Sequence, residues 1–440
     1  MKKLSSAFLL LLVFLFSFSS EANAWKFALV SDTQTKYDIN SKVLAALKFV
    51  VPNRVTYVMT GDITAQGTTE QYANWNKILT GTYGSIDSGI LPTNWWSNYS
   101  TNPPEYFSPA GWHDKGGGGQ TPDAIWRANW VNNLPAQVGL SAYATDLNGN
   151  PLRGDPGGLY GSTKYDNTLW MWLDDDPKTS PPGMEIFIDK TLARAANDSQ
   201  ITWKFILHHR NVISCGGGHS DWSVGQGWHN NYFVKYGVDF VINGHNHYYL
   251  RNCPMTSATS KTCDSNYRGN IINGDPAGPI HITAGGAGGG YYTLNCTQSC
   301  SQCPWVEKGI GQTRFFLEFD ISGGTLVMKM WRVDTSKSRP YLTSSTPYDT
   351  LTFKKGPPGT PPPSPTPGQA TATPRPTKTP TPTSQPGTPG DGNGDGIVNG
   401  QDFIIWLIHF GQNVSGASSG DYNDNGKIEI GDYIVWVDNY

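Results

Sequence analysis

The sequence predicts an α/β fold for most of the chain and a small all-α unit over residues 391–440. From Trp25 onward, short apolar runs typical of strands alternate with runs typical of helices. An acidic residue lies just past each of the first two expected strands, and α/β folds place their functional sites at that end of the strands. At Gly356 the composition changes abruptly to proline and threonine, which separates the two parts.

Length and composition set the first limits on function. The chain has 440 residues, enough for two or three domains and a sizeable core. Its net charge is only −3 and no basic block interleaves with aromatic residues, so nothing indicates nucleic-acid binding. The many glycines and prolines, with few charged residues, are typical of a loop-rich exported protein.

The first residues predict export. Lys2 and Lys3 precede an apolar stretch from Ala7 to Phe18, and Ala22-Asn23-Ala24 fits the pattern that signal peptidases cleave. We therefore expect residues 1–24 to be a signal peptide and the mature protein to be secreted or associated with the cell surface. A retained membrane anchor is the alternative, but the apolar stretch is short for a membrane span. No later segment is suited to span a membrane.

The six cysteines lie in one region of the chain, and an exported protein is expected to pair them as disulfides. Cys253 and Cys263 bracket a short loop. The cluster of Cys296, Cys300 and Cys303 could instead hold zinc, although an oxidising compartment favours disulfides. Six cysteines allow many pairings, and the sequence does not choose among them.

The expected elements follow in order along the chain. Lys26–Val30 and Arg54–Met59 are expected strands, and Ser41–Val50 and Glu70–Leu79 are expected helices. The stretch from Thr80 to Pro156 contains few periodic segments, so it is either a functional loop region or a sign that the element assignment is incomplete. Further strands are expected at Thr168–Leu173, Thr202–Leu207, Val238–Asn243 and Ile280–Thr283, a helix at Met184–Ala196, and a hairpin across Phe315–Met330.

Residues 356–390 are a predicted linker, because they contain no apolar periodicity from which a core could form. Such a Pro/Thr-rich segment acts as a semi-rigid spacer. The expected layout is thus a signal peptide over residues 1–24, a catalytic domain over 25–355, the linker, and a C-terminal domain over 391–440.

The C-terminal domain contains two predicted calcium loops. Oxygen-bearing side chains recur at the spacing of a calcium-binding loop, with a glycine at the sharp turn, and each loop precedes a short apolar helix. Because the pattern occurs twice in the same register, it is not a chance match. The candidate ligands are Asp391, Asn393, Asp395, Ile397, Asn399 and Asp402 in the first loop, and Asp421, Asn423, Asn425, Lys427, Glu429 and Asp432 in the second.

Polar side chains follow the buried strands of the α/β part. They are Asp32, Asp62, His208, His245 and His247. Because strand ends meet at one edge of a sheet, these groups can supply ligands for two divalent cations, with one aspartate between them. Two adjacent metal ions clamp a phosphoryl group for in-line attack, so hydrolysis of a phosphate ester is the predicted reaction. The alternative for the loop histidines is that they are only hydrogen-bonded to their surroundings.

These motifs resemble those of the calcineurin-like metallophosphoesterases. Gly61-Asp62, Gly111-Trp112-His113-Asp114, His208-His209 and Gly244-His245-Asn246-His247 occur in that family's order. The stretch from Gly237 to Arg251 is similar to the purple acid phosphatase branch in particular. The resemblance covers about residues 25–355 and implies a four-layer α/β/β/α sandwich with a dinuclear metal site.

Carried over residue by residue, the resemblance implies a role for each motif. Asp32 and His247 bind the first metal, His208 and His245 bind the second, and Asp62 bridges the two. His113 lies near the leaving group, which it stabilises or protonates. Zinc, manganese and iron all suit this mixture of nitrogen and oxygen ligands.

Three positions depart from the family's pattern. Gln34 replaces a histidine and offers only a weak amide ligand, and Trp112 replaces an asparagine and cannot coordinate a metal. The second metal is therefore expected to be short of one ligand. Ala65 stands where purple acid phosphatases carry a tyrosinate, so an iron–tyrosinate chromophore is not expected.

Three other histidines receive simpler interpretations. His209 and His219 border the predicted crevice and are candidates for contact with substrate. His281, in an apolar strand, is expected to be a core residue.

Residues 391–440 resemble a dockerin, which implies a cohesin-like partner. Gly400-Gln401 and Ile430-Gly431 stand where dockerins commonly carry hydroxyl residues that help to select the partner, so the partner is not predictable. The predicted function is thus an exported metal-dependent phosphoesterase of phosphate mono- or diesters with a calcium-dependent docking module. The alternative, suggested by Gln34 and Trp112, is a catalytically impaired binding protein of the same fold displayed through the same module.

Overall fold

The computed structural model describes most of the chain outside its first residues, the long loop region and the linker. The described residues form two compact units, one before and one after the predicted linker. Within these parts, no helix is both long enough and apolar enough to cross a membrane. The described ranges are 24–52, 56–79, 106–116, 159–175, 184–295, 303–355 and 389–439 without 395, 397 and 399, together with residues 126, 144, 145, 151 and 152.

The first of two large sheets in the N-terminal unit has the strand order β12-β17-β16-β15-β1-β2-β3. Strand β1 pairs in parallel with β2 and antiparallel with β15. The strands are β1 (Trp25–Leu29), β2 (Thr56–Val58), β3 (Tyr106–Phe107), β12 (Ile271–Asn273), β15 (Arg314–Ser322), β16 (Thr325–Val333) and β17 (Asp349–Lys354).

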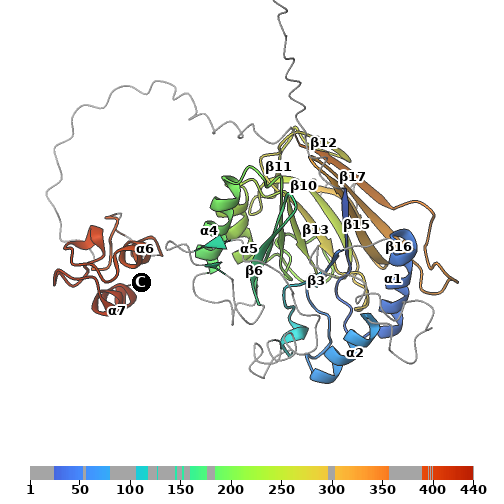
Figure 1. Ribbon diagram of the computed structural model, residues 1–440, viewed down its shortest axis with the longest axis horizontal. Coiled ribbons are helices and arrows are strands. Elements are labelled where there is room, and N and C mark those ends of the chain that lie inside the picture. Colours follow the sequence, from blue (N-terminus) through green and yellow to red (C-terminus); the bar gives the residue numbers. More distant parts are fainter. Residues whose placement is uncertain are drawn as a thin grey trace, which may run out of the picture. The chain divides into compact units, whose positions relative to one another are not determined.

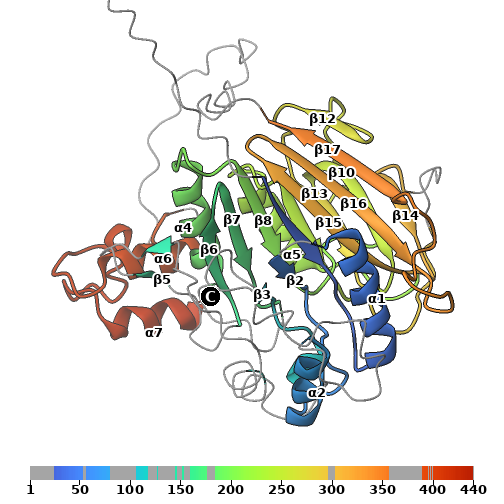
Figure 2. The same cartoon turned by 45° about the vertical axis from the view of Figure 1, so that its right-hand side comes forward.

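The second sheet has the order β11-β10-β13-β9-β8-β7-β6, and β14 pairs with β10. Its central strands β7, β8, β9 and β13 are all parallel, and Figure 2 shows β6, β7 and β8 side by side. The strands are β6 (Gly161–Tyr165), β7 (Thr168–Trp172), β8 (Trp203–Leu207), β9 (Phe240–Asn243), β10 (Tyr249–Ser257), β11 (Thr262–Cys263), β13 (Ile280–Ala284) and β14 (Val306–Ile310), and a separate ladder joins β4 (Ala144–Thr145) to β5 (Pro151–Leu152).

The main core lies between the two sheets. Alternate residues of each strand point into it, so Phe27 of β1 stacks on Phe319 of β15 with 4.2 Å between ring centroids, and Phe205 of β8 packs against both strands' aromatic rings. The intervening residues face outward: Ala28 and Val30 belong to a second cluster under the helices. Successive residues thus face opposite sides of the sheet, and both sides are covered. The strands are therefore nearly continuous apolar runs in the sequence.

Helices cover the outer face of each sheet, which gives the expected order of helix, sheet, sheet and helix (Figure 1). Helices α1 (Tyr37–Val50) and α2 (Thr69–Leu79) pack on the first sheet. Helices α4 (Met184–Ala196) and α5 (Ser223–Trp228), with a π-helical turn at His229–Phe233, pack on the second. The four-layer α/β/β/α expectation is therefore confirmed for this unit.

Strand β10 was not predicted. It carries Arg251, whose guanidinium donates to Asp349 at 2.8 Å and to the Gly269 carbonyl at 3.0 Å. Both side chains of this ion pair are buried. A strand expected from its apolar residues alone would have Arg251 at the surface. The predicted hairpin is confirmed as β15 and β16, and the predicted Arg54–Met59 strand is shorter, as β2, with residues 53–55 outside the described residues.

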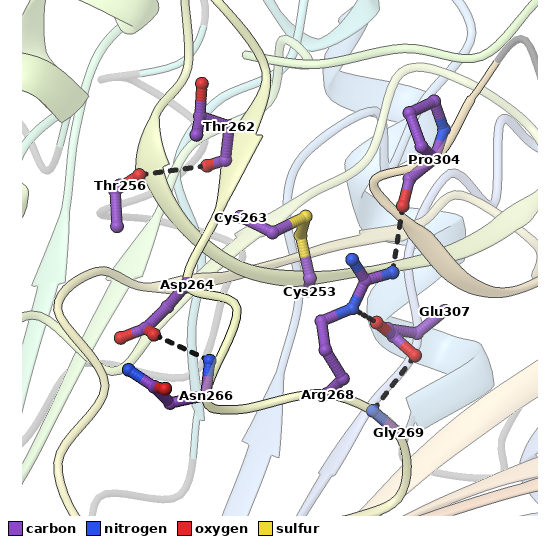
Figure 3. The surroundings of a disulfide bond; sticks show 10 residues. All are labelled: Cys253, Thr256, Thr262, Cys263, Asp264, Asn266, Arg268, Gly269, Pro304 and Glu307. Carbon is purple, nitrogen blue, oxygen red and sulfur yellow. Dashed lines mark hydrogen bonds and ion pairs between the residues drawn. A yellow bond between two sulfur atoms is a disulfide. The ribbon is translucent and has the colours of Figure 1, made fainter.

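Among the described residues two disulfides join Cys253 to Cys263 and Cys215 to Cys303, as expected for the cysteines. Figure 3 shows the first, which ties β10 to β11 beside Arg268. The Arg268 guanidinium pairs with Glu307 and donates to the Pro304 carbonyl at 2.8 Å, so this side chain holds the loop before β12 against β14. Cys296 and Cys300 lie outside the described residues.

The C-terminal unit contains two helices, α6 (Gly400–His409) and α7 (Ile430–Asn439), and a short 3-10 helix at Ala417–Ser419. Its small core is built around Trp406, Tyr422 and Ile428.

Candidate metal centre

The loops that follow β1, β2, β8 and β9 bring together Asp32, Asp62, His209, His245 and His247. The first two loops are joined by hydrogen bonds, because Ser31 Oγ donates to the Gly61 carbonyl at 3.0 Å and the Asp32 amide donates to the same carbonyl at 3.3 Å. The third and fourth loops meet them through side chains. The site thus lies at the carboxyl ends of strands from both sheets, where parallel strands place their functional groups.

Asp62, His209 and His245 form the most compact group. Their ligand atoms all lie within 4.8 Å of one another. His209 Nε2 is 3.1 Å from Asp62 Oδ2, and His245 Nδ1 is 3.1 Å from His209 Nε2. One carboxylate and two imidazoles at these separations can surround a single divalent cation.

Asp32, His247 and Gln34 form the other half of the site. Asp32 Oδ1 is 3.5 Å from His247 Nε2 and accepts a hydrogen bond from the His245 amide at 2.8 Å. Asp32 Oδ2 is buried and has no hydrogen-bond partner among the described residues. The Gln34 amide nitrogen lies 3.3 Å from His247 Nε2 and 3.4 Å from Asp62 Oδ2, so Gln34 lies between the two halves. An unpartnered buried carboxylate oxygen fits a bound cation, since a buried charge is otherwise costly.

Three histidines share one arrangement of their rings. His113, His209 and His247 each place Nδ1 against a backbone carbonyl, those of Ala65 at 2.8 Å, Thr60 at 2.8 Å and Gly290 at 2.6 Å. A carbonyl can only accept, so Nδ1 carries a proton and Nε2 faces the carboxylates. Metal-binding histidines are commonly oriented by such a second hydrogen bond.

Several of these residues have a left-handed backbone. The φ angles are 58° at Asp32, 52° at Asp62 and 67° at His245, with Gln34 and Thr35 also positive. Non-glycine residues rarely adopt this conformation, and they cluster at functional sites when they do. Gly111 and Gly244 are required by close approach, because a β-carbon would collide with Asp62 at the first position and with Asp32 at the second.

The structure places His208 away from the site, and this corrects the sequence-based assignment. The Asn243 side-chain nitrogen lies 2.9 Å from Nδ1 and 3.1 Å from Nε2 of His208, and Asp175 lies 3.5 Å from Nδ1. The ring packs against Trp222 and Trp228 beneath the helices. His209, which was assigned only possible contact with substrate, occupies the position in the cluster instead.

The period of two along β8 explains this exchange. Phe205 and Leu207 face the core between the sheets, whereas Ile206 faces the helices. Continuing the alternation puts His208 on the helix side and His209 on the side of the site. The larger side chains of Trp203, Phe205 and Leu207 distinguish one set of alternate residues in the sequence, but only the packing shows that this set, and hence His209, faces the site.

The charges of the site compensate one another. Burial lowers the pKa of His209, but Asp62, Asp32 and Asp175 outweigh it and raise the pKa to about 10. Burial raises the pKa of Asp62, but His209, followed by His113 and His245, holds it well below its usual range. Burial, His209 and His219 lower the pKa of His245 to about 2, which keeps this imidazole neutral and able to bind a metal.

His113 and Asp114 lie in a short 3-10 helix at His113–Lys115. The His113 amide donates to Asp62 Oδ1 at 2.8 Å, and its ring Nε2 lies 4.0 Å from Asp62 Oδ2, with the side chain 39% exposed. Asp114 is buried and accepts from the amides of Thr64 at 2.9 Å and Gly111 at 3.0 Å, so it fixes the loops on both sides of Asp62. Burial and then Asp62 raise the pKa of Asp114 to about 6.

Two further aromatic residues border the site. His219 stacks on His245 with 3.6 Å between ring centroids, and Tyr292 stacks on His247 at 4.3 Å. Tyr292 was not among the residues predicted from the sequence. His281 is buried and lies 2.9 Å from the buried His229, so its expected place in the core is confirmed.

The two predicted calcium loops of the C-terminal unit have matching hydrogen bonds. Asp391 accepts from the amides of Gly394 and Gly396, at 2.7 and 2.8 Å, and Asp421 accepts from Asn425 and Gly426, at 3.0 and 2.8 Å. Asp402 and Asp432, at the ends of the loops, are fully buried. Asn393, Asn423, Lys427 and Glu429 lie in the described parts of the loops, whereas Asp395, Ile397 and Asn399 lie outside the described residues.

A family model described as calcineurin-like phosphoesterase matches residues 26–249. This match covers half of the chain, and the chain therefore belongs to that family. The matched range includes every residue of the proposed centre up to His247.

Individual relatives are distant. Two uncharacterized proteins of Mycobacterium tuberculosis strains are each 31% identical over 108 residues, which are 23% of this chain and 20% of theirs. The chain thus matches about a fifth of the length of these relatives. Among solved structures, purple acid phosphatase PPD1 of yellow lupin (Lupinus luteus) has a TM-score of 0.48 and 15% identity over 76% of this chain and 54% of that one. PhoD has a TM-score of 0.44 and 11% identity over 76% of this chain and 72% of its own.

Proposed function

We propose that the N-terminal unit hydrolyses phosphate mono- or diesters with two divalent metal ions. The observation that carries the proposal is the cluster of Asp62, His209 and His245 beside the unpartnered buried oxygen of Asp32. Membership of the calcineurin-like phosphoesterase family supports the same reaction class.

The candidate ligands divide into two sets that share Asp62. His209 and His245 would hold one ion with Asp62, while Asp32 and His247 would hold the other, with Gln34 as a weak additional ligand. Asp62 would be the shared residue, because its Oδ2 lies 3.1 Å from His209 Nε2 and accepts from Gln34 Nε2 at 3.4 Å. When bound, zinc, manganese or iron would neutralise the charge of the phosphoryl group and lower the pKa of a water molecule.

His113 is the proposed proton donor to the leaving group. Its Nδ1 is fixed on the Ala65 carbonyl, so Nε2 faces the space beside Asp62. The exposed fraction of 39% leaves this ring accessible to substrate, unlike the buried His209. An imidazole that reaches the leaving group from this side can donate a proton to it.

The two metal positions should differ in affinity. Trp112 stands where the family pattern has an asparagine, and an indole cannot coordinate a metal. The ion held with His209 and His245 would therefore have one protein ligand fewer. Elemental analysis after mild chelation should find about one retained ion per catalytic unit, besides calcium, since loss of one ligand commonly costs at least tenfold in affinity.

The test is hydrolysis by the purified mature protein loaded with zinc, manganese or iron. Phosphate monoester and diester model compounds should both be offered, with Asp62→Ala as the inactive control. Turnover in the parent protein that is absent from Asp62→Ala supports the proposal. A metal-loaded protein that hydrolyses neither compound would favour the alternative, a binding protein that has kept the fold, for which Gln34 and Trp112 are the motivating observations.

For the C-terminal unit we propose calcium binding at the two loops and a role in docking to a cohesin-like protein. Calcium binding is supported by Asp391 and Asp421, which accept from amides of their loops, and by the buried Asp402 and Asp432. The C-terminal unit exposes a set of apolar residues suited to a partner: Ile404, Leu407 and Ile408 on α6, Phe410 directly after it, and Tyr433 and Ile434 on α7. Export to the cell surface or the medium fits both the signal-like first residues and the disulfides. Capture of a cohesin should disappear on calcium chelation.

A further inference from the structure

Tyr292 lies directly at the proposed centre, on the loop that follows β13. Its ring is nearly parallel to that of His247, with 4.3 Å between centroids and an angle of 11°. Its hydroxyl lies 3.5 Å from Nε2 of His219, whose ring in turn stacks on His245. Tyr292 therefore extends from the His247 half of the site to the His245 half.

The ring of Tyr292 is held in place from several sides. A β-carbon on Gly218 would approach Cδ2 of the ring to 2.6 Å, so glycine is needed for the ring to fit. The side chain also packs against the cluster that contains Tyr248, Leu250 and the Cys215–Cys303 disulfide. A side chain fixed in this way can present its hydroxyl without reorganisation, which is the condition for effective stabilisation of charge.

The hydroxyl remains available for a ligand. Its separation of 3.5 Å from His219 is too long for a good hydrogen bond, and the Tyr292 side chain is only partly buried. A phenol has an ordinary pKa near 10, so it is a donor at neutral pH. A phosphoryl group held between the two halves of the site presents acceptor oxygens that become more negative during in-line attack.

We propose that the Tyr292 hydroxyl donates a hydrogen bond to a non-bridging oxygen of the bound phosphoryl group, which makes Tyr292 a substrate-contacting residue. The inference rests on the proposed phosphoesterase function, and it assigns a role to a residue outside the metal ligands. It also explains why the Tyr292 ring lies on His247: the ring supports His247 while the hydroxyl reaches the substrate.

The test compares Tyr292→Phe with Tyr291→Phe in the full-length, metal-loaded protein. Tyr292→Phe keeps the ring on His247 and removes only the hydroxyl. Tyr291 is the matched control, because it is the neighbouring residue, is 52% exposed, and has its ring under the Arg314 guanidinium at 4.1 Å. Calorimetry should measure the affinity for inorganic phosphate, elemental analysis the metal content, and p-nitrophenyl phosphate the turnover.

We expect Tyr292→Phe to bind inorganic phosphate about tenfold more weakly and to lose turnover by a similar factor or more, as for removal of one donor to a charged group. Its metal content should equal that of the parent protein, and Tyr291→Phe should match the parent in all three measurements. Phosphate affinity of Tyr292→Phe within about twofold of the parent would overturn the inference. Loss of metal would overturn it too, because the role would then be support of His247. If the parent binds phosphate but hydrolyses nothing, the proposed function fails while the binding comparison still decides the role of Tyr292.

Discussion

The proposed metal centre and the predicted calcium loops of the C-terminal unit position their carboxylate oxygen atoms in opposite ways. In the centre, the Asp32 carboxylate accepts from His245, which lies 213 residues away. In the first loop of the C-terminal unit, Asp402 accepts from Gly392, only 10 residues away. Geometry in the loops follows from local spacing, whereas geometry in the centre depends on how two sheets bring four strand ends together. The positions of a local site can therefore be predicted from spacing alone. For a site built from distant segments, the predicted ligand can be wrong by one residue, as at His208 and His209.

The largest expected effect comes from His209→Ala, which breaks the non-local site. Turnover should fall by more than the roughly hundredfold typical of a residue that only supports a metal ligand. The reason is that His209 Nε2 lies 3.1 Å from Asp62 Oδ2 within the cluster. Steady-state hydrolysis of a model ester, with metal content measured in parallel, provides the check. If His209→Ala keeps near-parental turnover while His208→Ala is inactive, the assignment of the ligands must be reversed.

Calcium removal tests the local site. With free calcium at about a hundred to a thousand times its dissociation constant, binding stabilises a folded unit by roughly 3–4 kcal/mol. The C-terminal unit has a small core, so chelation with EGTA should lower or abolish its unfolding transition in calorimetry of the full chain, without moving that of the N-terminal unit. Asp432→Ala should reproduce the effect in part. An unchanged pair of transitions after chelation would contradict calcium binding.

His208→Ala should damage stability and spare catalysis. The buried His208 ring meets Asn243 and Asp175, and leaving such partners unsatisfied costs about 1–3 kcal/mol in the free energy of unfolding. Urea denaturation of the N-terminal unit measures this loss, and turnover below the denaturation range should stay close to parental. A stable but inactive variant would show that His208 takes part in the chemistry.

The N-terminal unit should lose stability in mild acid. Burial lowers the pKa of His229 to about 4 and that of His281 well below its usual value, so the folded unit keeps both rings neutral. Below about pH 6.5 the unfolded chain binds protons that the folded one does not, and stability falls as pH drops from there toward 4. Each such group contributes at most about 1.4 kcal/mol per pH unit.

The unfolding temperature of the N-terminal unit, measured from pH 7 to 4.5, checks this prediction. We expect His281→Gln to make that temperature depend less on pH. The unit that contains α6 and α7 has neither of these two histidines, so its transition is the comparison within the same sample.

The smallest effect is expected from removal of the C-terminal unit. The linker offers no apolar periodicity through which the two units could be coupled. A chain ending at Lys355 should hydrolyse a model ester at a rate within about twofold of the parent, since distant, independent regions act additively. Lower turnover of the shortened chain, at equal metal content, would show that the C-terminal unit contributes to catalysis.

Much of the site could be predicted because the sequence places Asp32, Asp62, His245 and His247 directly after apolar runs. Parallel strands put such residues at one edge of a sheet whatever lies between them, and the structure brings all four together. His208 was misassigned, because two adjacent histidines differ only in which face of β8 they continue. Tyr292 was missed as a site residue, because it lies in no spacing that predicts a contact with the metal ligands. Asp114 was noted within its motif but was given no role.

The sequence by itself determined the alternation of strands and helices, the boundary at the Pro/Thr-rich segment, and the repeated calcium-loop pattern, because each depends on neighbours within a few residues. Only the tertiary structure decided that His209 rather than His208 faces Asp62, that Arg251 is buried against Asp349 within a long strand, and that Tyr292 lies on His247. These outcomes depend on which faces of the two sheets pack against each other. The packing is the one with the lowest free energy for the whole unit, so no short stretch of sequence determines it.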